Sequence, residues 1–139
     1  MDRLAVLLGG RVAEDLIFKD VTTGAQNDLE RATKIARQMV TEYGMSDTLG
    51  PLTLGRKEHQ IFLGRDISQD RDYSEEVANK IDKEVRAIID TAYTKAKELL
   101  TKNKRKLKKI AKNLIERETL EGADLDMLLS GAKLASKTK

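Results

Sequence analysis

The chain is organised around residues 22–33, which read Thr-Thr-Gly-Ala-Gln-Asn-Asp-Leu-Glu-Arg-Ala-Thr. Thr23 and Gln26 have the spacing of a capping box, in which two side chains satisfy free backbone N–H groups at the start of a helix. Gly24 and Ala25 add almost no side-chain bulk to this turn. The stretch therefore predicts a turn that leads directly into a helix and that backbone or a ligand can approach closely.

Asp28 lies about one turn into this helix, where the peptide dipoles favour an ionised carboxylate. It shares a helix face with Ala32 and Ile35, so we expect it on the inward side, where an unpaired charge would be prohibitive. Its partner could be a metal ion or an arginine, and an acid in a first turn can also serve only the helix dipole. Asn27 would add a hydrogen bond or cap the turn.

Seven segments of the chain form one ordered pattern: residues 7–18 (LLGGRVAEDLIF), 22–29 (TTGAQNDL), 39–46 (MVTEYGMS), 62–66 (FLGRD), 73–74 (YS), 81–85 (IDKEV) and 114–120 (LIERETL). This pattern resembles the FtsH family of membrane-anchored, ATP-dependent zinc metalloproteases. The resemblance covers roughly residues 2–130, and it is specific because several separate motifs occur in the right order.

The resemblance implies a zinc site that this chain completes. Asp28 would be the third zinc ligand, and the other two would be histidines of a His-Glu-x-x-His motif upstream of this region. Glu14 would orient a zinc-bound histidine through a hydrogen bond, and Asn27 would support the site beside Asp28. The context of Glu14 alone also fits an exposed acid that adjoins Asp15.

Several features of the family pattern are missing from this sequence. It has one histidine, His59, and no His-Glu-x-x-His motif. It also has no Gly-rich phosphate loop followed by Lys and Ser or Thr, and no apolar run of 18 or more residues. We therefore expect the C-terminal part of a protease domain, soluble and inactive alone. His59 has no partner at metal-binding spacing, so we expect it on the surface.

For the complete protein, the resemblance implies an ATP-dependent zinc metalloendopeptidase that degrades unfolded or membrane polypeptides. Its cofactors would be zinc and ATP, with ATP bound in a module that this chain lacks. The protein would be a homo-hexamer anchored in a membrane, with this domain on the cytoplasmic, matrix or stromal side.

Composition favours a helical protein. Charged residues make up 35% of the 139 residues and aromatic residues 4%, with a single Pro and no Cys. Such a balance favours helices with charged outer faces, and the lack of Cys excludes disulfides and thiolate metal sites. The length suits one domain with a core of its own. The net charge of +3 is too small to argue for nucleic-acid binding.

Apolar periodicity predicts an all-α helical bundle with one long helix and a short irregular or hairpin segment. We expect one domain over residues 1–130, with helices over 3–18, 24–43, 74–100, 104–118 and 122–130, an irregular segment over 45–73 and a disordered tail over 131–139. Ser74 would cap the long helix, and Gly44 would end the second helix in the left-handed conformation. The glycine pair Gly9-Gly10 within a helix indicates a close neighbour.

The apolar residues expected to be buried recur at helical spacing. They are Leu4, Leu7, Leu8, Val12 and Leu16 in the first helix; Leu29, Ala32, Ile35, Ala36, Met39 and Val40 in the second; Val77, Ile81, Val85, Ile88, Ala92, Ala96 and Leu99 in the third; and Leu107, Ile110, Ala111, Leu114 and Ile115 in the fourth.

A basic run favours an alternative function. Between Lys102 and Lys112 there are seven Lys or Arg residues and no acid. The run is either a solvated helix face or a patch for nucleic acid or acidic lipid. It allows a non-enzymatic helical interaction module whose basic face binds nucleic acid or a protein. Because the run lacks the aromatic residues and Gly-rich loops that read bases, we expect no nucleic-acid partner.

Overall fold

The computed structural model describes residues 1–20, 22–55 and 73–132. These ranges contain five α-helices and one 3-10 turn, and no strand. The elements are α1 (Asp2–Phe18), η1 (Thr23–Ala25), α2 (Gln26–Thr41), α3 (Glu75–Lys102), α4 (Lys104–Arg117) and α5 (Gly122–Ser130). The expected all-α fold with one long helix is confirmed, and the helix ends lie within two residues of the expected ones.

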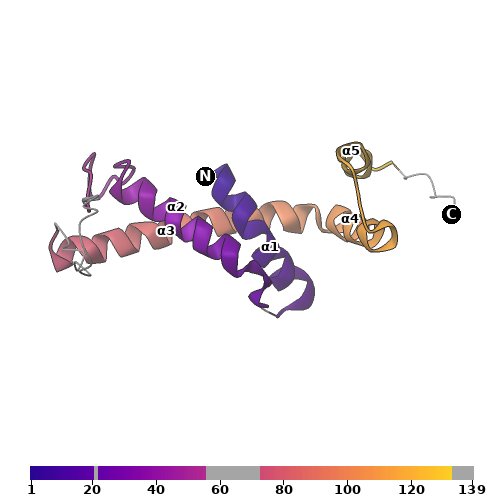
Figure 1. The fold of residues 1–139 in the computed structure, drawn as a ribbon, viewed down its shortest axis with the longest axis horizontal. Coiled ribbons are helices and arrows are strands. Elements are labelled where there is room, and N and C mark those ends of the chain that lie inside the picture. The colour runs from indigo at the N-terminus through magenta and orange to yellow at the C-terminus, as the bar shows by residue number, and fades with distance from the viewer. Residues whose placement is uncertain (21, 56–72, 133–139) are drawn as a thin grey trace, which may run out of the picture. The chain divides into compact units, whose positions relative to one another are not determined.

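Some expectations fall on residues that the structure does not describe. The possible hairpin and His59 belong to residues 56–72, and most of the expected tail belongs to residues 133–139. The described chain divides into two compact units, Met1–Ala96 and Lys97–Lys139. The first unit holds α1, α2 and most of α3, and it contains the elements around Asp28 (Figure 1).

The core of the first unit forms around one face of α2. Ala32, Ala36 and Val40 on this face have no exposed surface. Two clusters of buried residues meet there: Leu4, Leu8, Ala32 and Ala92 in one, and Ala36, Val40, Ile81 and Val85 in the other. The clusters join α1 and α3 to α2, and Figure 1 shows both shorter helices lying against α3. The alanines of these clusters, Ala32, Ala36 and Ala92, let the helices approach closely.

Polar contacts join α1 to α3 at the edge of this core. The Tyr93 hydroxyl donates a hydrogen bond to Asp15 at 3.1 Å. The Lys95 ammonium donates to the Asp2 carboxylate and holds the pKa of Asp2 below its ordinary value. A lowered carboxyl pKa adds stability that is lost as the pH falls through the acidic range and Asp2 becomes protonated. Because the Asp2–Lys95 pair is exposed to solvent, this contribution is small.

The segment after α2 folds back onto the helix. Gly44 has the left-handed conformation expected from the sequence, with φ of 61°, and the Leu54 N–H donates to the Thr41 carbonyl at 2.7 Å. The buried Ser46 hydroxyl donates to Glu84 of α3 at 2.9 Å and accepts from the Leu49 N–H at 3.1 Å. Glu84 thereby attaches this segment to α3.

The start of α3 has the cap that its sequence predicts. The Ser74 hydroxyl accepts a hydrogen bond from the Val77 N–H at 3.3 Å. Glu75 and Glu76 lie in the first turn, where they favour the positive end of the helix. A hydrogen bond from Lys80 lowers the pKa of Glu76.

In the second unit, the expected burial of one helix is not found. The apolar residues of α4 were expected in the core, but no residue of α4 is buried, and Ile115 is 81% exposed. Apolar periodicity identifies one side of a helix, yet burial also needs a second element to cover that side. Here α5 contacts α4, and Lys109 donates to the Gly131 and Ala132 carbonyls just after α5. Leu29 and Leu99 are also exposed, at 37% and 52%, where burial was expected.

The glycine pair in α1 has no close neighbour among the described residues. No atom lies within 4 Å of a Cβ placed on Gly9 or Gly10, so the expected close contact is not found there. Among the described helices, none combines the length and the apolar character that crossing a membrane requires.

Two glycine substitutions should have opposite effects on the stability of this chain. Gly44→Ala should lower the free energy of unfolding by about 2–3 kcal/mol, because φ is positive and its Cβ would lie 3.0 Å from the Pro51 Cα. Gly10→Ala should raise it by about 0.5–1 kcal/mol, because this helical position has open space. Urea unfolding of both variants measures the difference, and a Gly44→Ala variant as stable as wild type would contradict the described loop.

The contact between α3 and the loop gives a second stability prediction. Glu84→Ala should lower the free energy of unfolding by about 1–2 kcal/mol, because it leaves the buried Ser46 hydroxyl without its acceptor. The matched control is Glu98→Ala, which changes an exposed glutamate on the same helix and should change stability little. Equal urea midpoints for the two variants would show that Glu84 does not hold the loop.

Candidate functional site

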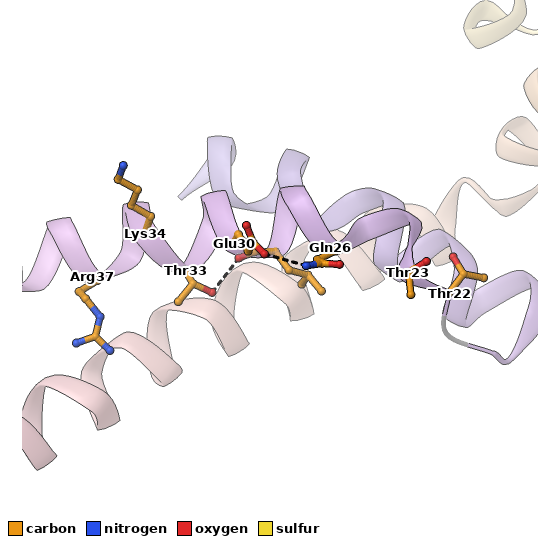
Figure 2. Close-up of a pocket in the computed structure, with 8 residues that line it drawn as sticks. Thr22, Thr23, Gln26, Glu30, Thr33, Lys34 and Arg37 are labelled. Atoms are coloured by element: carbon orange, nitrogen blue, oxygen red, sulfur yellow. Dashed lines mark hydrogen bonds between the residues drawn. The ribbon is translucent and has the colours of Figure 1, made fainter.

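The turn before α2 is built one residue earlier than the sequence suggested. Thr22, not Thr23, has the extended conformation of a capping residue, and its hydroxyl accepts a hydrogen bond from the Gly24 N–H at 3.2 Å. Gln26 does not return to the turn, since its amide donates to Glu30 at 3.0 Å (Figure 2). The expected Thr23–Gln26 capping box is therefore wrong.

The physical reason is the short 3-10 turn η1. It occupies Thr23–Ala25 and has its own capping residue, so α2 begins at Gln26 without a side-chain cap. Because two threonines stand side by side, either hydroxyl could have capped the turn. The sequence therefore indicated a capping threonine but not which of the two it is. Sequence reasoning did not identify Thr22 as the residue that organises the turn.

Glu14 extends from α1 to this turn. One carboxylate oxygen, Oε1, accepts a hydrogen bond from the Thr22 hydroxyl at 2.8 Å, and the other, Oε2, accepts from the Thr22 N–H at 3.4 Å. Gly24 lies close by, because a Cβ on it would be 3.5 Å from Glu14 Oε1. The structure thus brings Glu14 to the start of the segment that carries Asp28.

Asp28 lies in the first turn of α2. Its side chain is 46% exposed, and Arg31 lies 3.8 Å from it at the limit of an ion pair. The expectation that Asp28 lies inward, away from solvent, is therefore wrong. The buried stripe of α2 begins with Ala32, so the first turn extends beyond the part of the helix that its neighbours cover. Asn27, beside Asp28, is exposed.

An open groove of about 660 Å³ runs along α2 and the turn before it (Figure 2). Its lining residues are Thr22, Thr23, Gln26, Leu29, Glu30, Thr33, Lys34 and Arg37. Asp28 and Glu14 do not line this groove. Most of its polar lining residues are already engaged: Gln26 bonds to Glu30, and Arg37 pairs with Asp82 at 3.0 Å. The Thr33 hydroxyl donates to the Leu29 carbonyl, and the Thr22 hydroxyl donates to Glu14.

The Asp28 carboxylate is suited to be one of several ligands of a metal ion. A half-exposed carboxylate in the first turn of a helix is accessible to a ligand, and carboxylate oxygens are zinc ligands. The described residues contain no group of three His, Cys, Asp or Glu side chains that could hold a metal ion. A zinc site at Asp28 therefore needs ligands other than the described residues of this chain.

A comparison with known families identifies the chain. The model of peptidase family M41 matches residues 1–128. The chain belongs to peptidase family M41. The match runs from α1 into the last turn of α5 and includes residues of both units, and it agrees with the resemblance to FtsH proteases that the sequence motifs indicated.

Relatives of this M41 chain are named ATP-dependent zinc metalloproteases. The chain is 58% identical over 127 residues to FtsH 1 of Sphaerobacter thermophilus, covering 91% of this chain and 19% of that protein. It is 56% identical over 131 residues to FtsH 1 of a Thermoanaerobacter species, covering 94% and 21%. It is 52% identical over 130 residues to FtsH of Thermotoga maritima, again covering 94% and 21%. The M41 chain thus spans about a fifth of the length of these relatives.

Proposed function

We propose that the complete protein is an ATP-dependent zinc metalloendopeptidase and that this chain supplies one zinc ligand, Asp28. The observation that carries the proposal is the accessible Asp28 carboxylate in the first turn of α2, within a chain of family M41. The names of the relatives, which include both zinc and ATP, support the cofactors. The ATP-binding module would lie outside this chain.

The remaining zinc ligands would be the two histidines of the family's His-Glu-x-x-His motif. When bound, zinc lowers the pKa of a ligand water and polarises the peptide carbonyl. The contribution of this chain is to hold Asp28 in one place, because a ligand on a helix that packs against two others is restrained. Alone, with one such ligand, the chain would have no protease activity.

The resemblance to FtsH proteases also implies substrates, an assembly and a location for the complete protein. We propose that the substrates are unfolded or membrane polypeptides, and that ATP hydrolysis feeds them to the zinc site. The complete protein would be a membrane-anchored homo-hexamer with this domain on the cytoplasmic, matrix or stromal side.

A second candidate function is a helical interaction module, and the exposure of α4 favours it. Ile115 and Leu114 are 81% and 45% exposed on its apolar side, while Arg105, Lys106 and Lys108 are exposed basic residues. A helix with both features fits a protein partner that has an acidic, apolar surface. In this role the chain would bind its partner in a salt-dependent manner and would be indifferent to changes at Asp28.

The test uses the complete protein that contains this chain. Asp28→Asn should remove bound zinc and lower the cleavage rate of an unfolded protein at least about 100-fold, since even residues that only support the ligands contribute about 10–100-fold. The matched control is Asp90→Asn, which changes an exposed acid of α3 and should leave both properties unchanged. Zinc content is measured by atomic absorption.

Two results would contradict the proposal. If Asp28→Asn keeps its zinc and its cleavage rate, Asp28 serves only the helix start. If the wild-type complete protein contains no zinc and cleaves nothing, the metalloprotease assignment fails, and the interaction module becomes the better account.

A further inference from the structure

We propose that Thr22 is a positioning residue for the zinc ligand. Its hydroxyl, held by Glu14, fixes the turn from which α2 presents Asp28. This inference rests on the proposed function, because it concerns how Asp28 is placed for zinc. It assigns a role to a residue that the sequence motifs did not single out.

The Thr22 hydroxyl forms two hydrogen bonds in opposite directions. It donates its one proton to Glu14 Oε1 at 2.8 Å and accepts from the Gly24 N–H at 3.2 Å. The Thr22 N–H also donates to Glu14 Oε2 at 3.4 Å. A hydroxyl that donates to a carboxylate is a stronger acceptor for a further N–H, and charge-assisted bonds are stronger than neutral ones. The contacts therefore restrain both ends of the two-residue step from Thr22 to Gly24.

Both sides of this contact are attached to packed elements. Glu14 lies two residues beyond the fully buried Val12 in α1. On the other side, Gly24 is followed by the buried Ala25 and by α2, whose core face begins at Ala32. Asp28 lies between these two fixed points, so a change in the turn would shift or loosen the first turn of α2.

The hydrogen bonds between Glu14 and Thr22 leave little space for a side chain at Gly24. A Cβ at this position would lie 3.3 Å from the Thr22 hydroxyl and 3.5 Å from Glu14 Oε1. The first distance is tighter than ordinary van der Waals contact, so a larger residue would push the hydroxyl away from the Gly24 N–H. The absence of side-chain bulk in this turn therefore serves the Glu14–Thr22 contact.

Zinc affinity of the complete protein tests the positioning role directly. Thr22→Val removes the hydroxyl but keeps the shape, and it should weaken zinc binding by about 10-fold or more, as for residues that orient a ligand. Thr22→Ser restores the hydroxyl and should bind zinc within about 3-fold of wild type. Thr91→Val is the matched control, because it removes a threonine hydroxyl bond within α3 and should not change zinc affinity. Competition with a chromogenic chelator measures all four proteins.

A double-mutant cycle tests whether Thr22 acts with Glu14. Once Glu14→Ala has removed the carboxylate, adding Thr22→Val should cause a smaller loss of zinc affinity than Thr22→Val causes alone, because only the hydrogen bond from the Gly24 N–H is left to lose. This expectation holds whether or not Glu14 also orients a zinc-bound histidine. If the two losses multiply instead, the residues act independently and the proposed contact is wrong.

The outcomes separate this inference from the proposed function. If wild type binds no zinc, the proposed function fails and the positioning role fails with it. If wild type binds zinc and Thr22→Val binds it equally well, only the positioning role is overturned, even when the variant melts at a lower temperature. Should Thr22→Val not fold, Thr22→Ala removes the same hydroxyl and must show the same loss of zinc affinity.

Discussion

The close packing of one face of α2 against α1 and α3 is the constraint on which the rest of the first unit depends. Ala32, Ala36 and Val40 have no exposed surface, so a larger side chain at these positions would separate the helices. Their burial sets the rotation of α2 about its own axis. That rotation places Asp28 at the margin of the covered face, where its carboxylate is held by a packed helix yet remains accessible to a ligand.

Polar contacts restrain α2 and the chain around it at both ends of this packed face. Before the helix, Glu14 of α1 holds Thr22. After it, Glu84 of α3 holds Ser46 and Thr48. Each contact uses a carboxylate on a neighbouring core helix and hydroxyls on the connecting segment. These contacts attach the segment after α2 to α3 and the turn before α2 to α1.

The sequence predicted the helices better than it predicted their surroundings. Apolar spacing located all five described helices to within two residues, because periodicity is a property of the helix itself. It failed for Ile115 of α4 and for Leu29 of α2, which are exposed, because burial depends on whether another element covers that side. The capping error at Thr23 had a local cause: the 3-10 turn moved the cap to Thr22. The motif made Asp28 a candidate ligand, but its exposure depends on where the packed face of α2 begins.

We propose that this chain contributes one zinc ligand, Asp28, to a site completed by residues outside the described chain. The most direct measurement is a crystal structure of the complete protein with zinc, using anomalous scattering at the zinc edge to locate the metal. If Asp28 is this ligand, one of its carboxylate oxygens should lie about 2.0–2.2 Å from the zinc, with the Thr22 hydroxyl still bound to Glu14. A zinc ion held by other residues, with Asp28 still paired only with Arg31, would contradict it.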